Sequence, residues 1–252
     1  MRIEEWDARY RSRERADLSA EPTPLVVETA LELAPGTALD VACGTGRMAI
    51  PLAAKGYQVT GVDIVPEMVA RARQKAAAHG VSVEWVVADA REFHLQQQFL
   101  FLYMVENAFQ FFHTRADQEA LLSRVREHLH PEGCFLFETR NPSPRNLFEP
   151  RRSEPQRFTT PDGGQLVITD DQPIYDPIAQ IQHCSSSYHW LYPDGQRVEK
   201  TQRTALRYVF PREIEALLFY NGFQIRSRYG SWQQEPLTAT SREMIFVCQR
   251  RV

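Results

Sequence analysis

LDVACGTG (residues 39–46), followed by VTGVD (59–63), decides the fold of this chain. Each segment carries an acidic residue at the end of an apolar strand, and the first then turns through two glycines into a helix. Glycine lets the backbone approach a ligand where a Cβ would clash, and the start of a helix offers free N–H groups. The acidic residue after the second strand can accept both hydroxyls of a ribose. The pattern predicts a nucleoside-binding half of an open α/β sheet.

Two kinds of nucleoside ligand fit this pattern. Gly44-x-Gly46-x-x-Ala49, with Asp63 about 20 residues further on, also fits a dinucleotide fingerprint, so an NAD(P)-dependent oxidoreductase is one alternative. Three features favour a different ligand. Asp40 would repel an anionic pyrophosphate and suits a cation, Asp89 ends a third strand where it suits an adenine amino group, and no hydride-transfer constellation follows.

The chain resembles the class I S-adenosylmethionine-dependent methyltransferases. Four segments carry the resemblance, in that family's order and spacing: LDVACGTG (39–46), VTGVDIVPEMV (59–69), VVADA (86–90) and LHPEGCFLFE (129–138). Two positions depart from it, because Ala42 stands where glycine is usual and Phe99-Leu100 where Phe-Asp is common. The resemblance implies a Rossmann-like, doubly wound sheet of seven mainly parallel strands, S-adenosyl-L-methionine as cofactor, and methyl transfer to nitrogen or oxygen of a small-molecule acceptor. A catalytically silent S-adenosylmethionine-binding partner subunit is a further alternative.

The cofactor-binding residues are the clearest expectation. They are Asp40, Ala42, Gly44, Gly46, Asp63, Ile64, Asp89 and Ala90, together with Tyr10. Ile64 is expected to pack on the adenine. Tyr10 belongs to the segment Trp6-Asp7-x-Arg9-Tyr10, which resembles the N-terminal cover of some small-molecule methyltransferases, although a solvated charged tail fits equally well.

Catalytic residues are harder to predict, because a sulfonium donor is already activated. Holding donor and acceptor aligned supplies most of the effect, about 7–11 kcal/mol. The candidates are Asn107 after the fourth strand, Arg140 after the fifth, and His183 and His189 on one face of a later strand. Each has a structural alternative: loop packing for Asn107, a salt bridge to Glu138 or Glu149 for Arg140, and a polar outer face for the histidines.

Composition narrows the class of protein. The 252 residues are 43% hydrophobic and 24% charged, with a net charge of −3, so no overall basic field favours nucleic acid. The charged N-terminus lacks the apolar region of a signal peptide, and no apolar run reaches the ~18 residues that a membrane span needs. The four cysteines are scattered, which predicts reduced thiols, no metal site and a cytoplasmic location.

The chain changes character after Asn141-Pro142. Before it, strands alternate with helices; the strands are expected at 38–42, 58–62, 83–87, 99–105 and 134–138, and the helices at 24–33, 46–54, 66–79 and 115–129. Thr23 can cap the first of these helices. After Asn141, residues 142–155 are expected to form a loop, and three turn signals then separate runs rich in β-branched and aromatic residues at 165–175, 178–192 and 196–209, which predicts an antiparallel meander. The α/β pattern then resumes with a helix at 211–221 and strands at 223–228 and 244–249.

We therefore expect two parts. Residues 1–141 and 210–252 form the cofactor-binding core, and residues 142–209 form an antiparallel β lid. Ligands of such sheets bind outside the carboxyl ends of the strands, and the insertion leaves from the carboxyl end of the fifth strand. It is therefore placed to cover the site, although it also suits a homodimer interface.

Overall fold

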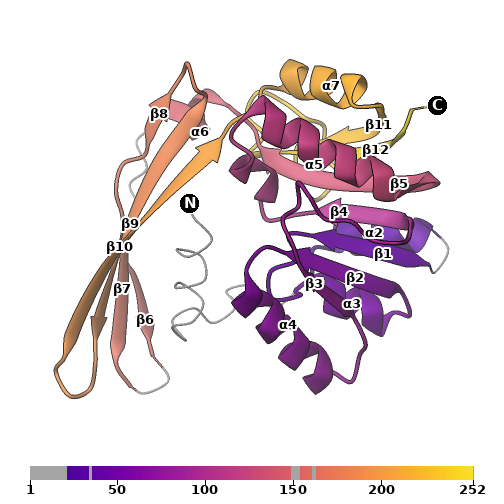
Figure 1. Cartoon of the computed structure of the whole chain (residues 1–252). Helices are drawn as coiled ribbons and strands as arrows, with labels where there is room; N and C mark the ends of the chain where they lie inside the picture. Colours follow the sequence, from indigo (N-terminus) through magenta and orange to yellow (C-terminus); the bar gives the residue numbers. More distant parts are fainter. Residues whose placement is uncertain (1–21, 34–35, 149–153, 161–162, 252) are drawn as a thin grey trace.

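The computed structural model describes residues 22–33, 36–148, 154–160 and 163–251. They form two sheets (Figure 1). The first has seven strands in the order β11-β12-β5-β4-β1-β2-β3. The second has five, in the order β10-β9-β7-β6 with β8 paired to β9.

The seven-stranded sheet is parallel except at one side. Its parallel strands are β1 (Thr37–Val41), β2 (Gln58–Asp63), β3 (Glu84–Val87), β4 (Phe99–Met104) and β5 (Leu129–Arg140). β12 (Glu243–Arg250) runs antiparallel to both β5 and β11 (Phe223–Tyr229). This arrangement confirms the predicted fold class.

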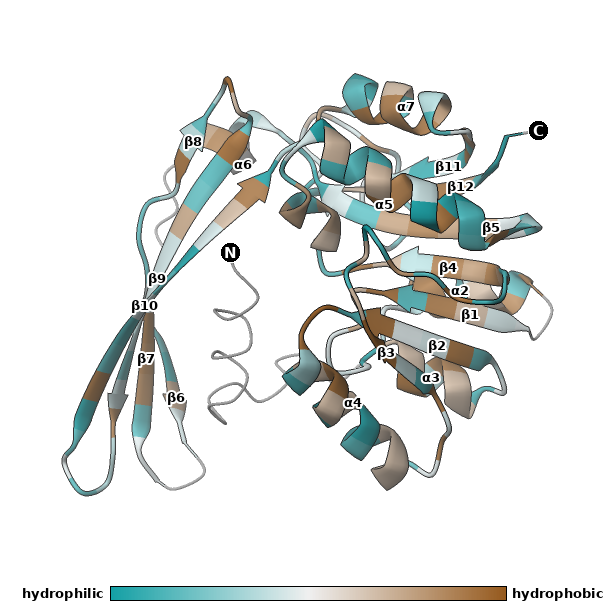
Figure 2. Ribbon diagram, viewed as in Figure 1, coloured by the Kyte–Doolittle hydropathy of each residue, from teal (hydrophilic) through white to brown (hydrophobic). Residues whose placement is uncertain are grey.

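Helices cover both faces of this sheet, as its continuous apolar strands require. On one face lie α2 (Pro24–Glu32), α3 (Ala49–Ala54) and α4 (Pro66–Ala78), which bury Val26, Leu52 and Val69 against it. On the other face lie α5 (Arg115–His128) and α7 (Pro211–Tyr220). Figure 2 shows the hydrophobic residues concentrated in the strands and on the inner sides of the helices. No described helix is long and apolar enough to span a bilayer.

The inserted sheet forms where the turn signals predicted it. Its strands are β6 (Gln156–Thr159), β7 (Gln165–Asp170), β8 (Ile174–Asp176), β9 (Ile181–Leu191) and β10 (Arg197–Arg207), and all neighbours are antiparallel. Gly195 adopts φ 85° in the turn between β9 and β10, a conformation that glycine reaches without strain.

The inserted sheet meets the first sheet at the carboxyl ends of the parallel strands. It follows β5 through the short helix α6 (Pro144–Phe148), and its last strand, β10, returns beside the 3-10 helix η1 (Ala108–Phe111), which follows β4. Gln110 Nε2 donates to the carbonyl of Arg207 at 3.3 Å, and His113 Nε2 donates to the carbonyl of Ala205 at 2.9 Å. The second sheet therefore stands opposite this edge of the first (Figure 1).

Three local predictions differ from the structure. The expected loop at 142–155 contains α6, and β6 begins at Gln156, a four-residue exposed edge strand without the alternation that reveals longer strands. β5 begins five residues before the predicted Cys134, because Leu129 already pairs with Phe99 of β4; residues 130–133 form an irregularity before Cys134 pairs with Phe101. Thr23 precedes α2 as expected, but its side chain makes no cap hydrogen bond and instead accepts one from Arg47.

Candidate active site

The loop after β1 is built from residues with left-handed backbone angles. Ala42, Gly44 and Gly46 have φ of 62°, 54° and 83°. A Cβ on Gly46 would lie 2.6 Å from Trp85, so that glycine is required by packing as well as by its backbone angle. A Cβ on Gly44 would meet only the sulfur of Met68, at 3.8 Å, so Gly44 borders open space.

Asp63, at the end of β2, holds this loop in place. Its Oδ2 accepts the N–H of Gly44 at 2.8 Å, and its Oδ1 accepts the N–H of Val65 at 2.9 Å, at the start of α4. The residue is buried, and burial raises the pKa of its carboxyl. A carboxylate has about four acceptor sites, so each oxygen can still accept a ribose hydroxyl. Ile64 follows it, half-buried beside the same loop.

Asp40 lies at the same edge, paired in register with Tyr103 of β4. It is 2% exposed, and burial, with a smaller contribution from Asp63, raises its pKa to about 8. The Tyr103 side chain, the charge of Arg47 and the N–H of Ala49 only partly oppose this rise. A buried carboxyl beside a glycine loop would be stabilised by a cationic ligand.

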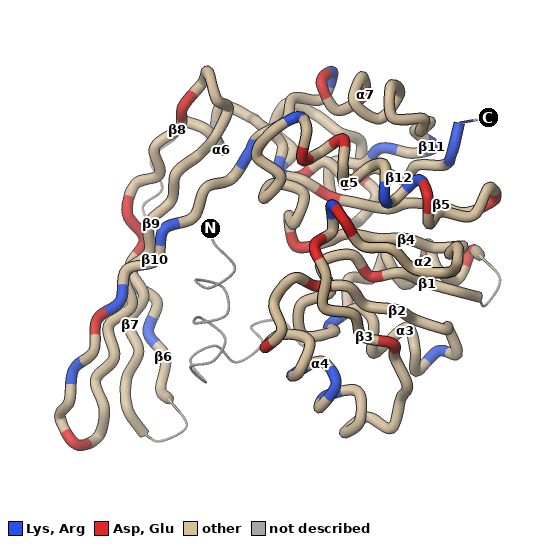
Figure 3. The backbone as a smooth tube through the Cα atoms, viewed as in Figure 1, with Lys and Arg blue, Asp and Glu red and all other residues tan. Residues whose placement is uncertain are grey.

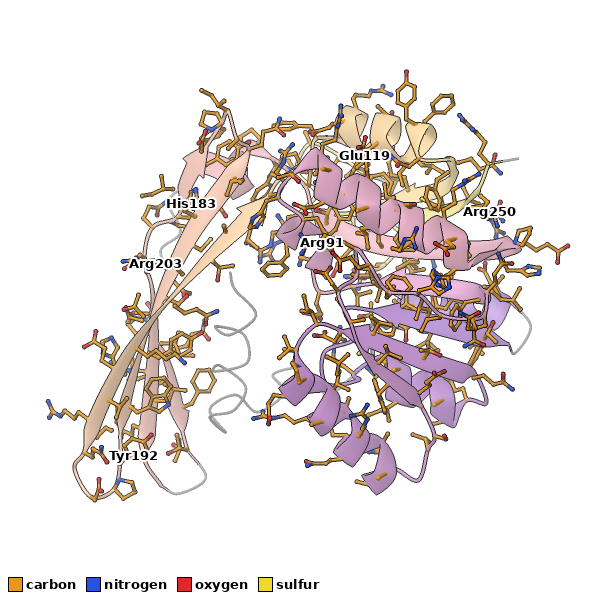
Figure 4. All side chains as sticks on the ribbon, viewed as in Figure 1. Arg91, Glu119, His183, Tyr192, Arg203 and Arg250 are labelled. Carbon is orange, nitrogen blue, oxygen red and sulfur yellow. The ribbon has the colours of Figure 1, made fainter. Side chains whose placement is uncertain are left out.

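Asp89 and Ala90 follow β3, as expected for residues near an adenine. The Asp89 carboxylate accepts hydrogen bonds from the Nε and NH2 atoms of Arg91 at 3.0 and 2.6 Å, and Arg91 in turn contacts Asp117 of α5 at 2.6 Å (Figure 4). Burial raises the pKa of Asp89, but the hydrogen bonds from Arg91 outweigh it and lower the pKa overall. An adenine amino group would therefore share Asp89 with Arg91.

The turn after β4 brings together charged residues that the sequence did not mark as a group. Glu106 binds Arg47, the residue after Gly46, and the N–H of Asn107 donates to Oε1 of Glu138 at 3.0 Å. Glu138 lies at the end of β5, only 4% exposed, and burial raises its pKa to about 7, helped by Glu243 and Glu106. Figure 3 shows several acidic residues along the edge of the first sheet that faces the second.

The remaining candidates lie apart from this group. His183 is exposed and His189 lies 3.8 Å from Glu199, on the face of β9 opposite the buried Tyr188 and Trp190 (His183 is labelled in Figure 4). The structure therefore does not bring either histidine to Asp40 or Asp63.

Arg140 and Tyr10 complete the set of candidates. Arg140 pairs in register with Glu243 of β12. Burial raises the pKa of Glu243, and the charges of Arg242 and Arg140 oppose this rise only in part. Tyr10 lies outside the described residues. Phe109, beside Asn107, is fully buried against Phe137 with ring centroids 5.1 Å apart, so it serves packing.

One group in the described part of the chain has the composition of a metal site: His94, Glu127 and His128. Both ring nitrogens of His128 are already engaged. Nε2 accepts the N–H of Leu95 at 2.8 Å, and Nδ1 lies 2.7 Å from the carbonyl of Arg124. His128 therefore has no lone pair to offer a metal in this arrangement.

Comparison with known proteins agrees with this geometry. Residues 38–133 match the family model described as a methyltransferase domain. A putative methyltransferase of Bacillus subtilis (strain 168), YqeM, is 28% identical over 218 residues, which are 85% of this chain and 84% of that protein.

Solved structures share the fold over almost the whole chain. An S-adenosylmethionine-dependent methyltransferase from Clostridium acetobutylicum ATCC 824 superposes with a TM-score of 0.78 at 17% identity, covering 99% of both chains. The sugar N-methyltransferase KedS8 from Streptoalloteichus sp ATCC 53650 superposes with a TM-score of 0.76 at 22% identity, covering 98% of this chain and 93% of its own. Residues 38–133 therefore form a methyltransferase domain, and the sequence relative and the shared fold are consistent with the class I S-adenosylmethionine-dependent methyltransferases.

Proposed function

We propose that the protein transfers a methyl group from S-adenosylmethionine to a nitrogen or oxygen atom of a small molecule. The carrying observation is the pair of buried carboxyls, Asp40 and Asp63, that flank the loop at 42–46. In this proposal Asp63 accepts the ribose hydroxyls, and Asp40 stabilises the positively charged methionine end of the donor. An anionic dinucleotide would gain nothing from Asp40, which argues against the oxidoreductase alternative.

The inserted sheet supports a small-molecule acceptor. It stands opposite the carboxyl edge and is fastened to η1 through Gln110 and His113, immediately after the Glu106–Asn107 turn. A covering sheet at this place encloses a small acceptor and excludes water from the reacting atoms. KedS8, a sugar N-methyltransferase of the same fold, makes nitrogen the first acceptor atom to test.

Two measurements test this function. Calorimetry with S-adenosylhomocysteine should give saturable one-site binding, whereas NAD and NADH should give no heat. Incubation of the protein with methyl-labelled S-adenosylmethionine and fractions of a small-molecule extract should yield a product heavier by one methyl group. Binding of S-adenosylhomocysteine without any labelled product would favour the catalytically silent partner subunit.

A homodimer through the inserted sheet is a second proposal. β10 lies at one edge of that sheet, and residues 197–201 along it are exposed. Such an edge can pair with a second copy, although Arg197, Lys200 and Arg203 oppose close pairing by their charge. Sedimentation equilibrium of the protein and of a Thr201→Pro variant decides it, because proline in an edge strand blocks pairing of this kind.

A further inference from the structure

The turn between β4 and η1 holds two successive non-glycine residues in the left-handed region. Glu106 and Asn107 have φ of 60° and 58°. This conformation is costly for residues with a Cβ, and it persists where the surroundings enforce it. The turn lies at the carboxyl end of β4, where ligands of parallel sheets bind.

The carboxylate of Glu138 supplies that enforcement from the neighbouring strand. Its Oε1 accepts the N–H of Asn107 at 3.0 Å, and the N–H of Glu106 also acts on it. Within the described part of the chain, no ion pair reaches Glu138. Burial of a carboxylate is costly, and the contacts that Glu138 makes among the described residues are with the backbone of the turn, so holding that turn explains its presence there.

The turn at Glu106 and Asn107 is connected both to the glycine loop at 42–46 and to the inserted sheet. The Glu106 side chain binds Arg47, the residue directly after the glycine loop, and Arg47 also donates to Thr23 Oγ1 at 3.3 Å. On the other side, the turn leads directly into η1, whose Gln110 anchors the end of β10. The buried Oδ1 of Asn107 has no hydrogen-bond partner among the described residues and can accept a hydrogen bond from an acceptor amine or hydroxyl.

We propose that Glu138 is a positioning residue for methyl transfer. Its carboxylate fixes the turn at Glu106 and Asn107. Through that turn it positions the Asn107 side chain and the Glu106–Arg47 ion pair beside the glycine loop at 42–46. The proposal rests on the proposed function, because the turn would position an acceptor only if the protein methylates one.

This role makes the turn sensitive to pH. Two acidic groups face Glu138, Glu106 after β4 and Glu243 on β12, and together with burial they raise its pKa to about 7. Arg47 offsets the charge of Glu106, while Arg140 and Arg242 act on Glu243. As the pH falls through 7, Glu138 gains a proton, loses acceptor strength toward the two N–H groups, and should release the turn.

The experiment compares Glu138→Gln with Glu243→Gln, which removes a neighbouring carboxylate that makes no hydrogen bond to the turn. Hydrogen exchange at the amides of Glu106 and Asn107, corrected for the intrinsic rate, should accelerate about ten- to a hundred-fold in Glu138→Gln, the range for loss of one hydrogen bond to a charged acceptor. Labelled methyl transfer to the active extract fraction should fall about ten-fold or more, while the dissociation constant for S-adenosylhomocysteine stays within about two-fold. At pH 8, where Glu138 is mostly ionised with or without the charge of Glu243, Glu243→Gln should leave all three near the wild-type values.

The wild-type protein provides a test that needs no substitution. Corrected exchange at the same two amides should rise as the pH is lowered from 8 to 6, whereas exchange within β4 should not. The proposal is overturned if exchange at the turn is the same in Glu138→Gln and wild type and shows no pH dependence, or if transfer stays normal when the turn is loosened. Absence of both S-adenosylhomocysteine binding and labelled product in the wild type would instead refute the proposed function, and the positioning role with it.

Discussion

Asp63 is joined to Gly44 by a hydrogen bond of 2.8 Å from the backbone N–H of the glycine to Oδ2 of the carboxylate. The residue expected to bind the donor's ribose is therefore also the residue that fixes the glycine loop. A substitution at Asp63 changes both at once, so loss of affinity alone does not identify its role.

Asp63→Ala should weaken binding of S-adenosylhomocysteine by about 1–3 kcal/mol, because buried hydroxyls lose their acceptors. The decisive comparison uses an analogue that lacks both ribose hydroxyls. Wild-type protein should prefer the complete ligand, and Asp63→Ala should bind the two ligands with similar affinity. If the variant discriminates between them as well as the wild type does, Asp63 serves the loop and not the ribose.

Donor binding should release a proton from Asp40. With a pKa of about 8, this carboxyl is mostly neutral at pH 7, and a cation beside it would lower its pKa. Up to about nine-tenths of a proton should leave at pH 7, and affinity should increase as the pH rises toward 8. Calorimetry of S-adenosylmethionine binding in phosphate and in Tris measures the proton from the difference in enthalpy.

The control for this prediction is Asp40→Asn, which should bind more weakly with equal enthalpy in the two buffers. An enthalpy that is independent of the buffer in the wild type would contradict the assignment of Asp40 to the cationic end of the donor.

The fold was predictable because its signals are local. Each strand, turn and helix is indicated by residues that are neighbours in the sequence, so the segments around Gly44, Asp63 and Asp89 could be assigned to strands and loops without coordinates. The residues predicted to bind the donor end or follow neighbouring parallel strands, so the topology alone brings them to one edge of the sheet.

The other half of the site could not be predicted because its contacts are long-range. Glu138 lies 31 positions from Asn107, and Arg47 lies 59 positions from Glu106, so no spacing rule connects them. The sequence did not indicate that Asp89 has a partner, yet Arg91, two residues later, donates hydrogen bonds to its carboxylate. An indirect signal existed in Glu106 and Glu138, two acidic residues at the ends of apolar strands.

Gly44 and Gly46 should respond differently to alanine. Gly44→Ala should lower the free energy of unfolding by about 1–2 kcal/mol through its backbone angle alone, because the new Cβ meets nothing closer than Met68. It should also weaken donor binding, because that Cβ enters the open space beside the loop. Gly46→Ala adds a clash with Trp85 and should lower the melting temperature further. Thermal denaturation and calorimetry separate the two effects; equal stability of the two variants would contradict this account. Gly44→Val should abolish donor binding.

Ala42→Gly should stabilise the protein. Ala42 occupies a left-handed conformation at φ 62°, which costs alanine about 1–2 kcal/mol, partly offset by the ~0.5–1 kcal/mol that glycine loses in entropy on folding. The net gain of somewhat under 1 kcal/mol should raise the melting temperature by about 2 °C. Ala70→Gly, in the middle of α4, is the matched control and should lower it. If the melting temperature falls in both variants, the left-handed conformation of Ala42 does not destabilise the loop at 42–46, and this prediction is wrong.

The inserted sheet should be dispensable for donor binding and required for methyl transfer. Asp40 and Asp63 lie on strands of the first sheet, and Gly44, Gly46 and Asp89 lie in the loops that follow its strands. The hydrogen bonds and ion pairs described above do not connect any of these five residues to β6–β10. Replacing residues 156–207 with a short Gly/Ser linker keeps Tyr208 and Val209, which are fully buried in the intact protein. The replacement removes contacts of Tyr208, including the hydrogen bond from its N–H to the carbonyl of Gln180 and the ring contact with Tyr175. It also frees the Gln110 and His113 side chains, which water can then satisfy.

The shortened protein should bind S-adenosylhomocysteine with an affinity within a few-fold of the full chain. It should form no labelled product from the extract fraction that the full chain methylates, because the acceptor would no longer be enclosed or shielded from water. Calorimetry and the labelled-donor assay on both proteins, with light scattering to follow their mass, make the comparison. Methylation at the normal rate by the shortened protein would exclude a catalytic lid, and a simultaneous change from dimer to monomer would instead assign the inserted sheet to self-association.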